Sequence, residues 1–374
     1  MTQLAKLCLN TCQLDNIDAI SYLVNLIELN LSDNLINISP LMQLTQIKIL
    51  VLDECNIDNL DALQHHVNLT ELSLIGNYGI DITTLQYLTQ LTKLVLDLCN
   101  LRNLNCLRPL INLTELSLSG NDNVDITPLQ FLMKLTKLRL QDCNLINVNL
   151  LRYLVHLQEL SLDNNENIDI TPLKYLTNLM VLGLAQCCLL DLNVLRPLVN
   201  LVDLSIFGNK YLNISVLQHF RNLKKLDSCS CCLINVDALK PLQKLQELTI
   251  LYNQIVYIQP IMELPHLTDL YAYDNKIIDI RTIEIHPNFN KFFLQSQELP
   301  TDEELKLANI MKWVNHSISS QRKMSSLYKK QKYKQSSFRL QIHGYLQKQY
   351  NNQATFDDLI ISLFTKLFQC DIAQ

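Results

Sequence analysis

The chain has 374 residues, of which 48% are hydrophobic and 18% charged, and its formal net charge at pH 7 is −5. This apolar content argues against intrinsic disorder, and the negative charge argues against a protein that binds nucleic acid over its whole surface. The six glycines disfavour a glycine-rich phosphate loop, and no apolar run reaches the 18 residues of a membrane span. The start, MTQLAKLCLNTCQLD, lacks the features of a signal peptide, so we expect a cytoplasmic protein.

One pattern, L-x-x-L-x-L-x-x-(N/C), repeats from Leu4 onward. Units begin 22 residues apart, except for one interval of 21 between Leu26 and Ile47, and the fourteenth unit is degenerate. The L-x-L segment alternates with period two, which predicts a short strand whose leucines face one side. Later apolar positions, such as Leu101 and Leu104, recur every three residues and predict a 3₁₀-like or irregular return segment.

These units together predict an α/β fold, a curved leucine-rich repeat solenoid over residues 1–298. One unit cannot bury its own leucines, so stacked units share a core and form a parallel sheet on the concave face. The convex side should be 3₁₀ or irregular, and residues 299–374 should form a helical, basic C-terminal segment. A complete repeat begins at Leu4, so we expect an open strand edge at this end that invites association.

The ninth position of each unit alternates between cysteine and asparagine, which suggests an ancestral module of 44 residues. We expect each asparagine to satisfy backbone groups of its turn, and each cysteine to fill the same slot as a small, weak donor. Alternate strands are about 9–10 Å apart and a disulfide needs Cα atoms within about 7 Å, so these cysteines should be unpaired. The alternating residues are Cys12, Asn34, Cys55, Asn77, Cys99, Asn121, Cys143, Asn165, Cys187, Asn209 and Cys231.

The sequence contains few features of a catalytic or metal-binding site. The motifs GxGxxG, GxxxxGK, HExxH and GxSxG are absent from the sequence, so we predict neither an enzyme nor a cofactor. Cys229, Cys231 and Cys232 form the only dense cysteine cluster, in which Cys231 should point inward and Cys229 toward the concave surface. Divergent side chains favour packing over a metal site. The pair His65 and His66 falls in a connection between repeats.

The concave face is predicted to be acidic. Positions three, five, seven and eight of the units carry fifteen acidic and six basic residues, a net charge of −9. Position three alternates in sign from Lys93 to Glu159, which predicts cross-strand ion pairs. The acids at positions seven and eight have fewer predicted partners, so they are candidates for binding a basic surface, although solubility alone is an alternative.

Aromatic and large apolar side chains gather at concave positions of the last units, where the middle units carry serine, glycine and alanine. Exposed aromatics beside acids are typical of a protein-binding hot spot. The alternative is that the C-terminal segment covers them as a cap. The residues concerned are Phe207, Leu251, Tyr252, Tyr271, Tyr273 and Phe293.

The C-terminal segment begins with a capping box, Thr301 to Glu304, before an apolar stripe that predicts a helix over the solenoid end. Residues 305–356 then hold ten basic residues and no acid, interleaved with aromatics. This stretch could contact nucleic acid or an anionic membrane, be a solvated helix face, or fold onto the acidic concave face. The predicted anion-contacting residues are Arg322, Lys323, Lys329, Lys330, Lys332 and Lys334.

The repeats LTELSLSGNDNVDITPLQFLMK and LTKLRLQDCNLINVNLLRYLVH resemble the 22-residue leucine-rich repeat class typified by a protein phosphatase 1 regulatory subunit. The resemblance covers about 80% of the chain by the extent of the repeats. It implies a non-catalytic scaffold that binds a protein partner on its concave face. A regulatory subunit of a phosphatase is one such scaffold. The alternative is an adaptor that binds RNA or anionic membrane through the basic tail. The partner-binding residues implied by position are Asp163, Phe207, Asp227, Leu251, Tyr252, Tyr271, Tyr273 and Asp274.

Overall fold

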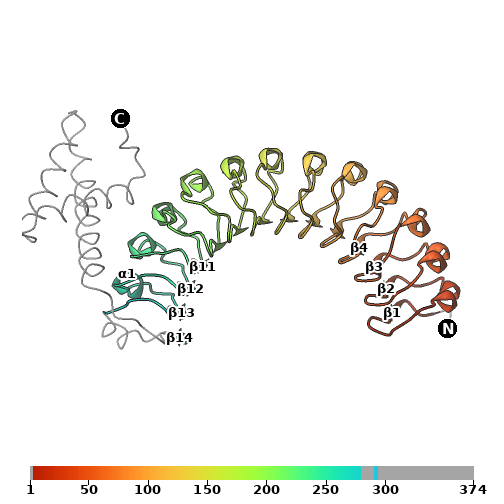
Figure 1. The fold of residues 1–374 in the computed structure, drawn as a ribbon, viewed down its shortest axis with the longest axis horizontal. Coiled ribbons are helices and arrows are strands. Elements are labelled where there is room, and N and C mark those ends of the chain that lie inside the picture. Colours follow the sequence, from red (N-terminus) through yellow and green to blue (C-terminus); the bar gives the residue numbers. More distant parts are fainter. Residues whose placement is uncertain (1–2, 279–289, 294–374) are drawn as a thin grey trace, which may run out of the picture. The chain divides into compact units, whose positions relative to one another are not determined.

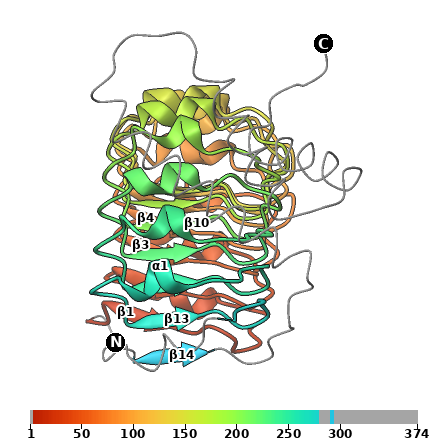
Figure 2. The same cartoon turned by 90° about the vertical axis from the view of Figure 1, so that its left-hand side faces the viewer.

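The computed structural model describes residues 3–278 and 290–293. Within them, fourteen three-residue strands form one parallel sheet whose order follows the chain. Strands line the inner side of an arc and short helices lie on its outer side (Figure 1), and all strands point the same way (Figure 2). The predicted leucine-rich repeat solenoid with a concave parallel sheet is therefore confirmed. The division between residues 298 and 299 stays a prediction.

The strands occupy positions three to five of each unit, as the L-x-L pattern predicts. They are β1 (Lys6–Cys8), β2 (Glu28–Asn30), β3 (Ile49–Val51), β4 (Glu71–Ser73), β5 (Lys93–Val95), β6 (Glu115–Ser117), β7 (Lys137–Arg139), β8 (Glu159–Ser161), β9 (Val181–Gly183), β10 (Asp203–Ser205), β11 (Lys225–Asp227), β12 (Glu247–Thr249), β13 (Asp269–Tyr271) and β14 (Lys291–Phe293). Equivalent residues of neighbouring units face each other, so Leu94 lies beside Leu116 and Leu116 beside Leu138. This register stacks each unit position into a row along the sheet.

The return segments are 3₁₀ helices with one four-residue α-helix. They are η1 (Asp18–Tyr22), η2 (Ser39–Gln43), η3 (Asp61–Leu63), η4 (Thr83–Tyr87), η5 (Asn105–Leu107), η6 (Thr127–Phe131), η7 (Asn149–Tyr153), η8 (Thr171–Tyr175), η9 (Asn193–Leu195), η10 (Ser215–His219), η11 (Asp237–Leu239) and α1 (Gln259–Met262). Three residues per turn bring every third side chain to one face, so Leu101, Leu104, Leu107 and Leu110 are all at most 5% exposed. The prediction from the three-residue spacing is confirmed.

A short polar side chain starts many of these helices. Asp125 Oδ1 accepts the Thr127 backbone N–H at 2.9 Å, and Asp169 Oδ1 accepts that of Thr171 at 2.9 Å. Hydrogen bonds from Thr127 hold the pKa of Asp125 below its usual value, and those from Thr171 do the same for Asp169. The turn from strand to helix is therefore fixed by local hydrogen bonding.

The ladder asparagines join two successive units. Asn121 Nδ2 donates to the carbonyls of Leu96, in the preceding unit, and Leu118, at 2.8 and 2.7 Å. Its Oδ1 accepts the backbone N–H groups of Cys99 and Leu101 at 3.2 and 2.9 Å, again in the preceding unit. The prediction that the asparagines satisfy the turn is confirmed, and each one also closes the turn of the cysteine unit before it.

The ladder cysteines are weaker donors in the same slot, as predicted. Cys143 is fully buried, and its Sγ donates to the carbonyls of Leu118 and Gln141, both at 3.2 Å. A thiol accepts hydrogen bonds poorly, so it cannot close the preceding asparagine turn as an amide does. That turn closes on itself instead, since the Val124 N–H donates to the Asn121 carbonyl at 3.3 Å. The two kinds of unit are complementary halves of the 44-residue module.

The eleven cysteines in the described part of the chain are free thiols. Burial raises the pKa of Cys143 to about 11 and that of Cys187 to about 12, so both are protonated and poorly reactive at neutral pH. No helix among residues 3–278 has both the length and the apolar character needed to cross a lipid bilayer.

Candidate functional site

The concave face presents three parallel rows of side chains, which we name row three, row five and row seven after their positions in the unit. Rows three and five belong to the strands, and row seven follows the carboxyl ends of the strands. Because register is maintained from β1 to β14, residues 22 apart in sequence become neighbours in a row. The rows place the predicted site residues of the last four units beside one another.

Row three is charged and partly paired. Lys137 lies 3.2 Å from Glu159 and 3.9 Å from Glu115 between the charged atoms. Toward the C-terminal end, Lys225 bonds Glu247 at 2.9 Å, which raises the pKa of Lys225. The predicted cross-strand ion pairs are therefore confirmed at Lys137. Pairs this exposed contribute about 0–1 kcal/mol each, so they order the surface more than they stabilise the fold.

The row-seven acids of the first units are structural, which corrects the expectation that they lack partners. Asp97 Oδ1 accepts the Ser117 hydroxyl at 2.6 Å and the Ser119 backbone N–H at 2.8 Å. Asp53 makes the same two bonds to Ser73 and Ile75. Each carboxylate thus ties its unit to the next one, an arrangement that charge counting could not reveal.

Asp163 belongs to this structural set. It accepts the Ala185 backbone N–H at 2.7 Å, the Ser161 hydroxyl at 2.5 Å and a Gln141 amide N–H at 3.1 Å. A Cβ on Gly183 would lie only 2.6 Å from an Asp163 oxygen, so the glycine makes room for the carboxylate. The predicted role of Asp163 in partner binding is untested, and its hydrogen bonds indicate a structural role.

Before unit 9 row seven is polar except for Ile75, and from unit 9 onward it is apolar. Its members there are Ala185, Phe207, Cys229, Leu251 and Tyr273, whereas the preceding units carry Ser119, Gln141 and Asp163. Phe207, Leu251 and Tyr273 are partly exposed. At about 4.8 Å per strand, the stripe extends about 20 Å along the sheet. We name these five residues the apolar stripe.

Cys229 departs from its predicted orientation. It is only 4% exposed, although the sequence placed it at the concave surface. Its backbone N–H donates to Asp227 Oδ1 at 3.1 Å, and burial, together with a hydrogen bond to Asp227, raises the pKa of its thiol. Cys231 points inward as predicted, since it is fully buried and donates to the Ile206 carbonyl at 3.1 Å. Cys229 lies between Phe207 and Leu251 in row seven.

Tyr252 extends the apolar stripe at its C-terminal end, where it packs against Tyr273. The rings of Tyr252 and Tyr273 are edge to face, with centroids 5.3 Å apart and an interplanar angle of 83°. Tyr252 is 54% exposed, and its hydrogen bond with Tyr273 raises the pKa of Tyr273. Tyr271 lies beside Thr249 in row five, and Asp274 follows Tyr273. The predicted partner-binding residues of units 10 to 13 therefore lie in neighbouring rows, and Asp163 of unit 8 bonds Ala185 at the start of the stripe.

Acidic side chains border the apolar stripe. Asp203 and Asp227 occupy rows three and five at its side, and both are half-buried. Desolvation raises the pKa of Asp203, while the nearby Lys225 ammonium opposes this effect. Among the described residues, Asp269 Oδ1 is a buried carboxylate oxygen that lacks a hydrogen-bond partner. Acids of this kind favour a cationic partner group that can restore their lost solvation.

The predicted tail residues Arg322, Lys323, Lys329, Lys330, Lys332 and Lys334 lie outside the described residues. The same holds for the capping box from Thr301 to Glu304, while for Phe293 only the backbone strand is described. Whether the tail covers the apolar stripe stays a prediction.

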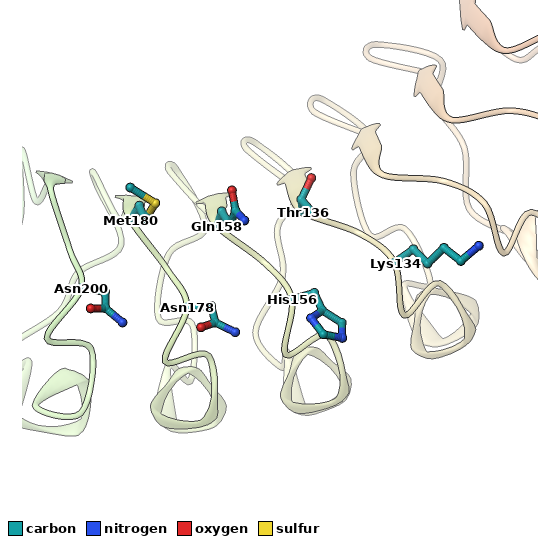
Figure 3. Close-up of a pocket in the computed structure, with 7 residues that line it drawn as sticks. All are labelled: Lys134, Thr136, His156, Gln158, Asn178, Met180 and Asn200. Carbon is teal, nitrogen blue, oxygen red and sulfur yellow. The ribbon is translucent and has the colours of Figure 1, made fainter.

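A groove on one side of the solenoid was missed by the sequence analysis. It has a volume of about 600 Å³ and lies between the strands and the 3₁₀ helices of the middle units. Figure 3 shows two rows of side chains along it, one from the ends of the units and one from the residues just before the strands. Its lining comprises Lys134, Thr136, His156, Gln158, Asn178, Met180 and Asn200. The signal in the sequence was the polar side chain that closes each unit.

No protein-family model matches the sequence, and no curated protein matches it. Among solved structures, an internalin (InlF) of Listeria monocytogenes is 29% identical, with a TM-score of 0.69, over 79% of this chain and 88% of its own. A leucine-rich repeat protein of Leptospira interrogans is 19% identical, with a TM-score of 0.59, over 82% and 94%. The fold is a leucine-rich repeat solenoid.

A third solved structure is similar to this leucine-rich repeat solenoid. InlJ from Listeria monocytogenes has a functional domain that includes a cysteine ladder. It is 19% identical, with a TM-score of 0.57, over 78% of this chain and 73% of its own. At this identity the similarity shows the fold alone. The resemblance to a phosphatase regulatory subunit stays a prediction.

Proposed function

We propose that this leucine-rich repeat solenoid is a non-catalytic scaffold that binds a protein partner on the C-terminal part of its concave face. The observation that carries the proposal is the change of row seven from polar residues to the apolar stripe. Nothing in the fold requires this change, because serine, glutamine and aspartate occupy the same backbone position in earlier units. Partly exposed aromatic and aliphatic side chains in one row are typical of binding hot spots.

The border of the apolar stripe defines the chemistry of the partner. Asp203, Asp227 and Tyr252 surround large apolar side chains, so a partner segment with an apolar anchor and flanking lysine or arginine residues fits best. The anchor would gain about 25 cal/mol per Å² of apolar area removed from water. The charges would set orientation and association rate more than affinity.

A triple substitution tests the proposal without disturbing the fold. Phe207→Ser, Leu251→Ser and Tyr273→Ser place in the apolar stripe the residue that row seven carries as Ser32 and Ser119. The wild-type chain and the triple variant serve as baits in lysate of the cells that express the chain, with quantitative mass spectrometry of the retained proteins. We expect one partner to be depleted at least tenfold on the variant, because removing buried anchors weakens hot-spot interfaces by several kcal/mol.

The matched control is Ile75→Ser, which makes the same kind of change in row seven far from the apolar stripe. It should retain the partner, and circular dichroism should show that all variants are folded. Identical retention by wild type and triple variant would contradict the proposal. Direct titration of the purified partner then gives its affinity for each variant.

Two finer possibilities make further requirements, one on the proteins retained in this experiment and one on a deletion variant. Regulation of a phosphatase, implied by the repeat resemblance, requires a phosphatase catalytic subunit among the proteins lost from the triple variant. An adaptor acting through the tail requires that deletion of residues 320–374, and not the triple substitution, abolishes binding to RNA or anionic vesicles. The apolar stripe favours the protein-binding scaffold.

A further inference from the structure

The positive charge of the solenoid is segregated on one surface. In units 5 to 9, the segments that close one unit and lead into the next strand contain five lysine or arginine residues and no acid. The segments are 107–114, 129–136, 151–158, 173–180 and 195–202, and their cations are Arg108, Lys134, Arg152, Lys174 and Arg196. All five side chains are exposed. We name the surface formed by these segments the basic flank.

Most of this charge is not neutralised. Arg108 is near Asp125 and helps to lower the pKa of that carboxyl, after the hydrogen bonds from Thr127. Lys134, Arg152, Lys174 and Arg196 form no ion pair with any residue in the described ranges. Arg108, Arg152, Lys174 and Arg196 share the eighteenth position of their units and so form one row, which Gln130 interrupts in unit 6. Lys134 lies four residues later, at the end of unit 6, where it donates to Asn112 Oδ1 at 2.8 Å. The Debye length is about 8 Å at physiological ionic strength, so a ligand on the basic flank is screened from most of the acidic concave face.

Exposed aromatic rings accompany the cations. Phe131, Tyr153 and Tyr175 are 45%, 45% and 52% exposed. The Arg152 guanidinium lies 4.9 Å from the Tyr153 ring centroid and donates to the Tyr153 hydroxyl at 2.8 Å. Lys174 lies 5.1 Å from the Tyr175 ring centroid. Arg108, Arg152 and Lys174 are thus held beside flat apolar surfaces, which reduces the conformational entropy lost on binding an anion.

The groove adds hydrogen-bonding groups along the same flank. Asn178 and Asn200 donate through Nδ2 to carbonyls of the preceding units, both at 2.9 Å, so their Oδ1 atoms remain available as acceptors. Lys134, His156 and Gln158 supply donors in the same groove (Figure 3). Donors and acceptors beside cations and rings suit the edges and faces of nucleobases as well as phosphates.

We propose that the basic flank binds single-stranded nucleic acid, with phosphates on the line of cations and bases against the aromatic rings and the groove. A linear polyanion matches a row of cations that runs through units 5, 7, 8 and 9, with Lys134 beside it in unit 6. The convex side of the solenoid curves away from any plane (Figure 1), so a flat membrane would contact few units at once. A flexible strand can follow the curve. This proposal is independent of the protein-binding scaffold, which uses the concave surface.

The test measures binding of a fluorescently labelled 20-nucleotide RNA, and of the same sequence as DNA, to the full chain by anisotropy at several salt concentrations. The flank variant carries Arg108→Gln, Arg152→Gln, Lys174→Gln and Arg196→Gln. Glutamine is the residue that other units have at this position, as in Gln86 and Gln130, so the fold accepts it. We expect at least a tenfold weaker affinity, and a salt slope reduced by about 3, since single strands lose about 0.7 per phosphate contact.

The control variant removes the same charge elsewhere, through Lys93→Gln, Arg102→Gln, Arg139→Gln and Lys210→Gln, all at exposed positions. It should keep most of the wild-type affinity and salt slope. Equal losses in both variants would show a response to net charge alone and overturn the proposal. Unchanged binding by the flank variant would place the nucleic-acid site elsewhere, and binding of anionic vesicles without either oligonucleotide would make the ligand a membrane; both also overturn it.

Discussion

The ladder position and row seven lie two residues apart in every unit, yet their amino-acid composition varies to different degrees along the solenoid. The ladder holds only asparagine or cysteine from Cys12 to Asn275, whereas row seven changes from polar and acidic residues to the apolar stripe. Ladder side chains must satisfy buried backbone groups, which water cannot reach. Row seven lies at the concave surface, and from unit 9 onward it no longer carries the acids that tie earlier units together, so its composition there is free to follow a partner. The predictions below test this contrast.

The largest effect should come from the ladder asparagine. Asn121→Ala removes the acceptor of two buried N–H groups and the donor to two carbonyls, one in its own unit and one in the preceding unit. We expect the free energy of unfolding to fall by about 4 kcal/mol, because several buried polar groups lose their partners together. Guanidinium denaturation measures this loss, and hydrogen exchange should show faster opening at Cys99 and Leu101. The exposed control Asn105→Ala should change stability by less than about 0.5 kcal/mol.

The next effect should be a gain. His66 is fully buried, although it falls in a connection between repeats, and other units carry leucine at its position, such as Leu88. Neither ring nitrogen has a hydrogen-bond partner among the described residues. Burial lowers the pKa of the His66 imidazole, and the nearby carbonyls of Leu41 and Leu63 oppose this shift. His66→Leu should therefore raise the free energy of unfolding by about 1–2 kcal/mol.

The same substitution should remove a pH dependence. Burial lowers the pKa of His66 in the folded state, so below about pH 6.5 the unfolded chain binds more protons than the folded one. Stability of the wild type should fall as pH decreases through this value, by at most about 1.4 kcal/mol per pH unit. Urea denaturation at pH 7.5, 6.5 and 5.5 measures the slope. Identical slopes for wild type and His66→Leu would contradict the assignment.

A smaller loss should separate structural acids from exposed ones. Asp97→Ala removes the acceptor for Ser117 and Ser119 and should lower the free energy of unfolding by about 1.5 kcal/mol. Asp142→Asn, at an exposed position with φ of 53°, should change it by less than about 0.5 kcal/mol because asparagine tolerates this conformation. Thermal denaturation compares the two. Equal effects would mean that the row-seven acids are not structural.

The smallest effect concerns the ladder cysteine. Cys143→Ala removes a weak thiol donor and leaves a small void, so we expect a loss of about 1 kcal/mol. Guanidinium denaturation of Cys143→Ala and Asn121→Ala under the same conditions compares the contributions of a ladder cysteine and a ladder asparagine. A loss as large as that of the asparagine variant would show that the thiol contributes more to the module than its hydrogen bonds suggest.

Much of the candidate site followed from the period of the repeat. Phe207, Leu251 and Tyr273 are 22 or 44 residues apart, so placing them in one row needed only the register of a parallel sheet. Other assignments failed because they depend on neighbours rather than position. The bonds of Asp97 and Asp163 depend on Ser117 and Gly183 in adjacent strands, and Cys229 is buried beside Asp227, which accepts its backbone N–H.

The sequence by itself determined the solenoid, its strands and its alternating ladder, because a 22-residue period leaves one way to bury every leucine. Only the tertiary structure decided which polar side chains belong to the fold and which belong to a surface. A carboxylate such as Asp53 and a cation such as Arg152 look equally exposed in a sequence pattern. In three dimensions the first accepts hydrogen bonds across a strand boundary, and the second stands on a flank without acids.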